Sequence, residues 1–271
     1  MTNFNKYLNP LSNSIHLYIS ILGSIVGVIV SAIFFIYSVY SSMDIVLAKF
    51  SLLLVIFFGS SLFCMLGNDQ DIIANSKILK SDFIIIDKKI FKIFFCFILS
   101  FFIFYFIKRY KAIIVINLSF SELLIIHIAV LFSIFNKTMQ AYCLASSKLL
   151  ENAILDLFRY SGYFLFLILW ILKKIDYVSL IFLIGELLVF VVIIFYLIFF
   201  IKKIKFNAKK VTFNKEYLSL GIAQFSYQSI FKLDIVTIAL LSNPRLVILY
   251  SILSNVIEGI INLTPSYNKL I

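Results

Sequence analysis

The chain has 271 residues, of which 62% are hydrophobic, 17% aromatic and only 14% charged. A water-soluble domain of this size could not bury so much apolar surface in one core. The formal charge is +11, but the Lys and Arg residues gather in short segments between apolar stretches. No aromatic-basic patch typical of nucleic-acid binding is present. We therefore expect lipid to be the main solvent, and we expect no nucleic-acid partner.

The apolar residues form stretches of about 20, the length that an α-helix needs to cross a hydrocarbon layer about 30 Å thick. A helix also satisfies its own backbone hydrogen bonds where no water is available. We therefore predict an all-α, polytopic transmembrane helix bundle with about eight spans. The predicted spans lie near residues 15–40, 46–67, 90–107, 118–142, 154–172, 178–201, 217–241 and 246–264.

The first predicted span contains a row of small residues. Ser20, Gly23, Ser24, Gly27 and Ser31 recur along it, a pattern that favours close helix packing over a substrate role. Its apolar stretch is longer than the core of a signal peptide, and no small-residue cleavage site follows it. We expect it to remain in the protein as a helix.

The loops predict the orientation in the membrane. Lys and Arg are enriched in cytoplasmic loops, and most of them lie on one side if the N-terminus is cytoplasmic, although Lys108, Arg109 and Lys111 then fall outside. The longest loop, near residues 68–89, is predicted to be a partly amphipathic interfacial segment. The basic residues of the two main inside loops are Lys77, Lys80, Lys88, Lys89 and Lys92, then Lys202, Lys203, Lys205, Lys209, Lys210 and Lys215.

Polar residues recur on one side of three predicted spans, at the spacing of helical turns. They are Ser133, Asn136, Lys137 and Gln140 in the fourth span, Gln224, Gln228 and Lys232 in the seventh, and Ser251, Asn255, Glu258 and Asn262 in the eighth. Amides and hydroxyls in such positions commonly join helices by interhelical hydrogen bonds. Charged residues inside a span need a partner or a hydrated cavity, and this applies to Lys137, Lys232, Asp234, Glu186 and Glu258.

No catalytic or metal-binding signature is found in the sequence. Cys64, Cys96 and Cys143 lack a C-x-x-C spacing and are expected to be structural thiols. His16 and His127 are isolated, so neither predicts a metal site. We expect no enzyme activity, no metal and no cofactor.

The seventh and eighth spans resemble a known family. The residues that carry the resemblance are Phe231 to Ile238 (FKLDIVTI), Leu246 to Tyr250, Ser254 to Glu258, and Pro265. They are similar to the middle of Wzx-type O-antigen and polysaccharide flippases, in which a basic residue and Asp lie in span seven and a Tyr opens span eight. The paired-helix rhythm from Ser14 to Asp71 resembles the opening of the same family.

The resemblance implies a fold and a function. Wzx-type flippases belong to the multidrug/oligosaccharidyl-lipid/polysaccharide exporter (MATE-like) superfamily, whose members have about twelve spans in two halves of six. Residues 1–205 would be the first six-helix bundle and residues 206–271 the start of the second. The expected function is translocation of undecaprenyl-pyrophosphate-linked O-antigen or other polysaccharide units, for lipopolysaccharide and polysaccharide biosynthesis, across the bacterial inner membrane by alternating access. The implied partners are the lipid-linked oligosaccharide, membrane lipids, a polysaccharide polymerase and a chain-length regulator.

The resemblance also gives the polar residues hypothetical roles. Substrate binding is assigned to Lys137, Gln140, Gln224, Gln228, Lys232 and Asn255, with the ammonium groups attracting pyrophosphate. Ion coupling is assigned to Asp234, Glu186 and Glu258.

Three other interpretations remain open. One is an ion-coupled multidrug or cation exporter of the same superfamily, which would need an acidic cavity. Another is a membrane-bound polysaccharide polymerase or acyltransferase, for which the expected large outward loop or catalytic His is missing. The last is a truncated, nonfunctional remnant, because the chain ends after about eight predicted spans.

Overall fold

The structure is a computed structural model, and it describes most of the middle of the chain. The described residues are 44–75, 83–87, 89–109, 118–146, 148–172, 177–200, 203–207, 217–223 and 225–226, with helical runs of two or three residues between 18 and 37 and single positions at 246 and 250. The described elements are α2 (Asp44–Met65), α3 (Asn68–Asn75), β1 (Phe83–Asp87), α4 (Lys89–Arg109), α5 (Phe120–Ala145), α6 (Leu149–Ile171), α7 (Leu180–Phe200) and β2 (Lys203–Asn207).

The described helices confirm the prediction of an all-α helical membrane bundle. The predicted second to sixth spans correspond to α2, α4, α5, α6 and α7. Four of these helices, α2, α5, α6 and α7, are long and apolar enough to cross a membrane, and α4 contributes the shorter apolar stretch Ile93–Phe106. The first, seventh and eighth predicted spans lie largely outside the described residues. The expected MATE-like halves therefore remain a prediction.

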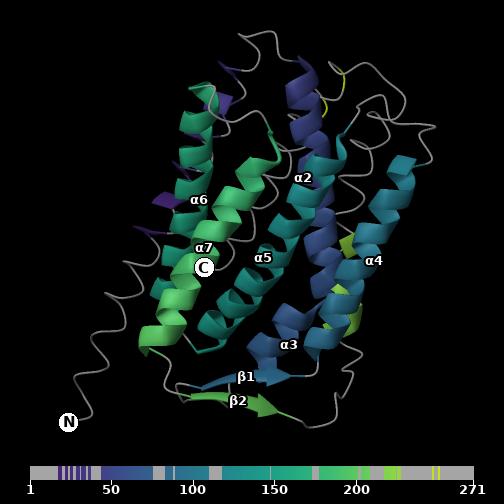
Figure 1. The fold of residues 1–271 in the computed structure, drawn as a ribbon. Coiled ribbons are helices and arrows are strands. Elements are labelled where there is room, and N and C mark those ends of the chain that lie inside the picture. The colour runs from purple at the N-terminus through teal and green to yellow at the C-terminus, as the bar shows by residue number, and fades with distance from the viewer. Residues whose placement is uncertain are drawn as a thin grey trace.

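Helix α5 lies at the centre of the bundle. It contacts α6 and α7 on one side, α2 and α4 on the other, and α3 near its C-terminal end (Figure 1). The outer helices expose large apolar side chains, such as Phe102 on α4, Leu165 on α6 and Phe195 on α7. Exposed apolar residues on this scale suit a surface that faces lipid chains.

An aromatic core joins α2, α6 and α7. Phe57 on α2 stacks on Phe182 of α7, with ring centroids 5.0 Å apart, and Trp170 of α6 lies 4.9 Å from Phe34. All four rings are buried. Aromatic pairs at these distances add about 0.5–1.5 kcal/mol each to the apolar contact.

Two glycines bring α6 and α7 into backbone contact. A Cβ on Gly162 would lie 2.7 Å from the Cα of Gly185, and a Cβ on Gly185 would overlap the ring of Tyr163. Small residues at a membrane helix interface permit this close approach. Gly162 lies one turn of α6 from Arg159, and Gly185 is next to Glu186 on α7. The glycine contact therefore sets the distance between the Arg159 and Glu186 side chains.

The bundle is joined at one end by a two-stranded parallel ribbon, which the sequence did not predict. Strands β1 and β2 pair from Phe83 with Lys203 to Asp87 with Asn207, and Figure 1 shows them beyond the ends of α5 and α7. The predicted interfacial loop near residues 68–89 therefore contains α3 and β1. The predicted domain boundary at residue 205 falls within β2, and the division into domains stays a prediction.

The pairing of β1 with β2 predicts that the segments next to them lie on the same side of the membrane. Short epitopes inserted between residues 76 and 82 and between residues 208 and 216 should be reached by antibody from the same membrane side, because their neighbouring strands pair. The Lys-rich loops predict the cytoplasmic side. Antibody binding to right-side-out and inverted vesicles measures this, and epitopes found on opposite sides would contradict the strand pairing.

Candidate functional site

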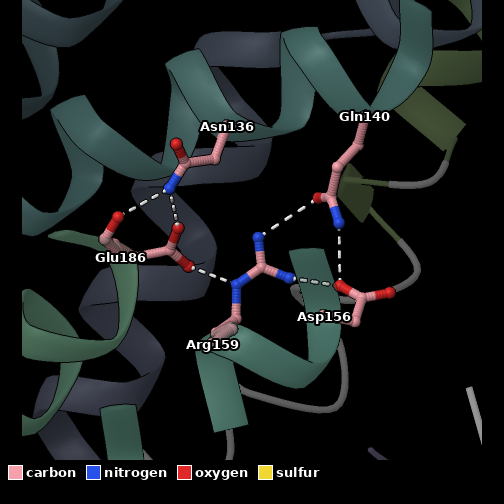
Figure 2. A network of polar contacts seen from close by, with 5 residues as sticks. All are labelled: Asn136, Gln140, Asp156, Arg159 and Glu186. Atoms are coloured by element: carbon pink, nitrogen blue, oxygen red, sulfur yellow. Dashed lines mark hydrogen bonds and ion pairs between the residues drawn. The ribbon is translucent and has the colours of Figure 1, made fainter. Parts of the chain in front are cut away.

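A network of charged and amide side chains connects α5, α6 and α7 in the bundle interior (Figure 2). Arg159 of α6 is its centre. The Arg159 Nε donates to Glu186 Oε1 of α7 at 2.8 Å, and its Nη1 donates to Asp156 Oδ1 at 2.6 Å. The Nη2 donates to Gln140 Oε1 of α5 at 3.1 Å. One guanidinium thus holds side chains from all three helices.

Two amides of α5 complete the network. Asn136 Nδ2 donates to Glu186 Oε2 at 2.7 Å and to the backbone oxygen of the same residue at 2.8 Å. One turn later, Gln140 Nε2 donates to Asp156 Oδ1 at 2.8 Å. Asn136 and Gln140 therefore share the face of α5 that looks toward α6 and α7, in agreement with their predicted common side.

The solvent exposure of the side chains increases along the network from Glu186 to Asp156. Glu186 is 2% exposed and Asn136 is fully buried, whereas the side chains of Arg159 and Asp156 are 15% and 31% exposed. A buried carboxylate is tolerated only when it is paired and hydrogen-bonded, and Glu186 receives both a guanidinium and an amide. The network thus runs from a deeply buried carboxylate to a partly exposed one.

The partly exposed end of the network opens into a cavity of about 290 Å³. The cavity lies among the turn between α2 and α3, the second half of α5, the start of α6 and Gly221. Its lining residues are Leu62, Met65, Leu66, Gly67, Asp69, Ile73, Lys137, Gln140, Ala141, Leu144, Asn152, Asp156 and Gly221.

The turn between α2 and α3 shapes one wall of this cavity. Gly67 has φ of +80°, a conformation that side-chain-bearing residues rarely adopt. The backbone of Tyr217 and Gly221 packs directly against it, so that a Cβ on Gly67 or Gly221 would overlap backbone atoms of the other segment. This backbone contact connects residues 217–223 to the α2–α3 turn.

Three of the residues singled out by sequence lie in this region. Lys137 and Gln140 line the cavity, and Glu186 is the buried end of the network. Lys137 faces the α2–α3 turn while its neighbour Asn136 faces α7. The polar residues predicted on one side of the fourth span therefore contact two different parts of the bundle. The other predicted residues, Gln224, Gln228, Lys232, Asp234, Asn255 and Glu258, lie outside the described residues.

Sequence reasoning missed four residues of the site. Asp156 and Arg159 stand three residues apart in an apolar helix, and this spacing is a signal for an intrahelical ion pair facing the protein interior. Asp69 and Asn152 had no such signal, because each lies near a helix end, where polar residues are common. Only the packing of α3 and α6 against α5 brings them to the cavity.

A second polar contact joins α2 and α5 near the opposite end of α5. The Lys49 Nζ lies 3.3 Å from Glu122 Oε1. Glu122 also accepts from the backbone N of Ser119, whose hydroxyl caps the helix start in return. This capping box orients Glu122, and the ion pair then connects the N-terminal turn of α5 to α2.

No candidate metal centre exists among the residues that the structure describes. No group of three or more His, Cys, Asp and Glu side chains there could hold an ion. Cys64, Cys96 and Cys143 are buried thiols outside any disulfide. His127 Nδ1 contacts the Leu123 oxygen at 2.8 Å, and its ring packs edge-on against Phe101. His16 lies outside the described residues.

The Arg159–Glu186 pair gives a prediction for stability. Glu186→Leu leaves the guanidinium without its most buried acceptor and should destabilise the protein by about 3 kcal/mol or more. The double variant Arg159→Met/Glu186→Leu removes both charges and should recover most of this loss. Thermal unfolding followed by the fluorescence of Trp170, the only tryptophan in the chain, measures both.

The matched comparison is Glu122→Leu, which removes a carboxylate paired with the partly exposed Lys49. Glu122→Leu should lower the stability less than Glu186→Leu does, because solvent screens the charge that remains on Lys49. A double variant as unstable as Glu186→Leu alone would show that the loss does not come from the unpaired guanidinium.

The arrangement as a whole provides donors, acceptors and both signs of charge inside an apolar bundle. Such groups can bind a polar solute, and their shared hydrogen bonds can respond when one partner is engaged. No model of a known family, no characterised protein and no solved structure matches this sequence.

Proposed function

We propose that the protein is a membrane flippase for lipid-linked oligosaccharides. The observation that carries the proposal is the continuity between the buried Arg159–Glu186 network and the polar cavity, inside helices long enough to span a membrane. A bundle that only needed stability would do as well or better with apolar residues in place of this buried ion pair. A functional role for Arg159 and Glu186 would explain why the protein keeps two charges whose burial costs free energy.

The proposed roles follow the chemistry of the groups. Lys137 and Gln140 contact the cargo in the cavity, together with Gln224, Gln228, Lys232 and Asn255 of the later spans. Glu186 couples transport to an ion or proton, as proposed also for Asp234 and Glu258. Glu186 is suited to this role because neutralising it would weaken its hold on Arg159 and thereby loosen the contact between α6 and α7.

The test is transport by the purified chain in liposomes. A fluorescently labelled undecaprenyl-pyrophosphate oligosaccharide is placed in both leaflets, and a membrane-impermeant quencher reports the movement of the label between them. Movement faster than in protein-free liposomes is expected, because the protein offers the sugar a polar route. Equal rates with and without correctly folded protein would refute the flippase proposal.

Ion coupling makes a separate prediction in the same liposomes. A proton or sodium gradient should accelerate movement several-fold in the wild type, and Glu186→Gln should abolish this acceleration because the amide cannot change its charge. The matched control is Glu151→Gln at the start of α6, a carboxylate that lies outside the network and does not line the cavity. A gradient effect that persists in Glu186→Gln would remove Glu186 from the coupling role.

A second candidate function is export of cationic compounds by an ion-coupled transporter. The observation that favours it is the placement of Asp69 and Asp156 on the cavity wall, since carboxylates attract cations. Uptake of ethidium by the same liposomes under a pH gradient distinguishes the two candidates. Ethidium transport without oligosaccharide movement would favour the exporter.

A further inference from the structure

Two charged groups of the cavity lack a direct hydrogen bond or ion pair among the described residues. Among the described residues, the Lys137 ammonium and the Asp69 carboxylate make no hydrogen bond or ion pair, although both line the cavity. Asn152 lies on the same wall. An ammonium donates hydrogen bonds and a carboxylate accepts them, so these groups suit a ligand that offers both donors and acceptors.

The charge around the cavity selects among ligands. Lys137 and Arg159 carry positive charge, and Asp69, Asp156 and Glu186 carry negative charge, so the carboxylates exceed the cations by one. Arg159 already donates to Asp156, Glu186 and Gln140, and Lys137 is the one cation among the described residues that line the cavity. A pyrophosphate group would add negative charge next to Asp69 and Asp156, at low dielectric, where like charges repel strongly.

The size of the cavity narrows the choice further. Its volume of about 290 Å³ lies at the lower end of the range for small-molecule sites, roughly 300–1,000 Å³. Gly67 and Gly221 bound it by direct backbone contact, so no side chain can move aside at this point of the wall. The cavity accommodates one ring-sized group, and the rest of an oligosaccharide would extend out of it.

We infer that this cavity is the subsite for a single uncharged sugar unit of the cargo, and that the pyrophosphate binds elsewhere. The inference rests on the proposed function and specifies it. Sugar hydroxyls accept from the Lys137 ammonium and donate to the Asp69 carboxylate, and no net charge enters the cavity. The role of Lys137 is therefore hydrogen bonding to a hydroxyl, in place of the pyrophosphate contact expected from sequence.

The test measures binding of free probes to the full chain in lipid nanodiscs without sugar detergents. The probes are methyl glucoside and N-acetylglucosamine as neutral sugars, glucuronate and inorganic pyrophosphate as anions, and glucosamine as a cation. Saturation-transfer difference NMR reports the carbohydrates, and phosphorus line broadening reports pyrophosphate. Binding of the neutral sugars in preference to every charged probe is expected.

Variants locate the binding. Lys137→Met should weaken neutral-sugar binding about tenfold, the effect of one hydrogen bond to a charged group. Lys148→Met is the matched control, because Lys148 contacts Tyr196 and does not line the cavity, and it should leave binding unchanged. Asp69→Leu should also weaken binding, and normal Trp170 fluorescence in each variant checks folding.

Three results would overturn the inference: preferential binding of pyrophosphate, glucuronate or glucosamine, unchanged sugar binding in correctly folded Lys137→Met, or no binding of any probe. The liposome experiment distinguishes a failure of the sugar-subsite inference from a failure of the flippase proposal. Oligosaccharide movement without neutral-sugar binding would refute the subsite alone. Sugar binding that depends on Lys137, without oligosaccharide movement, would refute the flippase alone.

Discussion

The ion pair between Arg159 and Glu186 is the interaction on which the rest of the site depends. Glu186 is almost completely buried, and a carboxylate at that depth needs a charged partner close by. The guanidinium reaches it because Gly162 and Gly185 bring the backbones of α6 and α7 together. The same guanidinium then has donors left for Asp156 and Gln140, so a single side chain orients the polar groups of three helices.

This arrangement connects the buried end of the network with the cavity. Arg159 is shared between a buried carboxylate and one that lines the cavity. A solute that engages Asp156 or Gln140 would compete for donors that also hold Glu186 at the contact between α6 and α7. The proposed transport function would use this link between cargo binding and helix packing.

Much of the bundle was predictable from residue types alone. The helices α2, α4, α5, α6 and α7 lie where apolar stretches of membrane-spanning length predicted them, because hydropathy and length are local properties. The common face of Asn136 and Gln140 followed from helical periodicity. The β1–β2 ribbon was not predictable, since its strands are separated by four helices and their pairing depends on how the bundle brings them together.

The sequence by itself determined that this protein is a helical membrane bundle with charged residues inside its spans. It also indicated Lys137, Gln140 and Glu186 as members of a polar site, because ionisable groups among lipid-crossing residues are too costly to be incidental. Only the tertiary structure decided their partners. Glu186 pairs with Arg159 rather than with Lys137, and Asp69 and Asn152 join the cavity, because contacts between helices depend on helix rotation and crossing, which no single segment encodes.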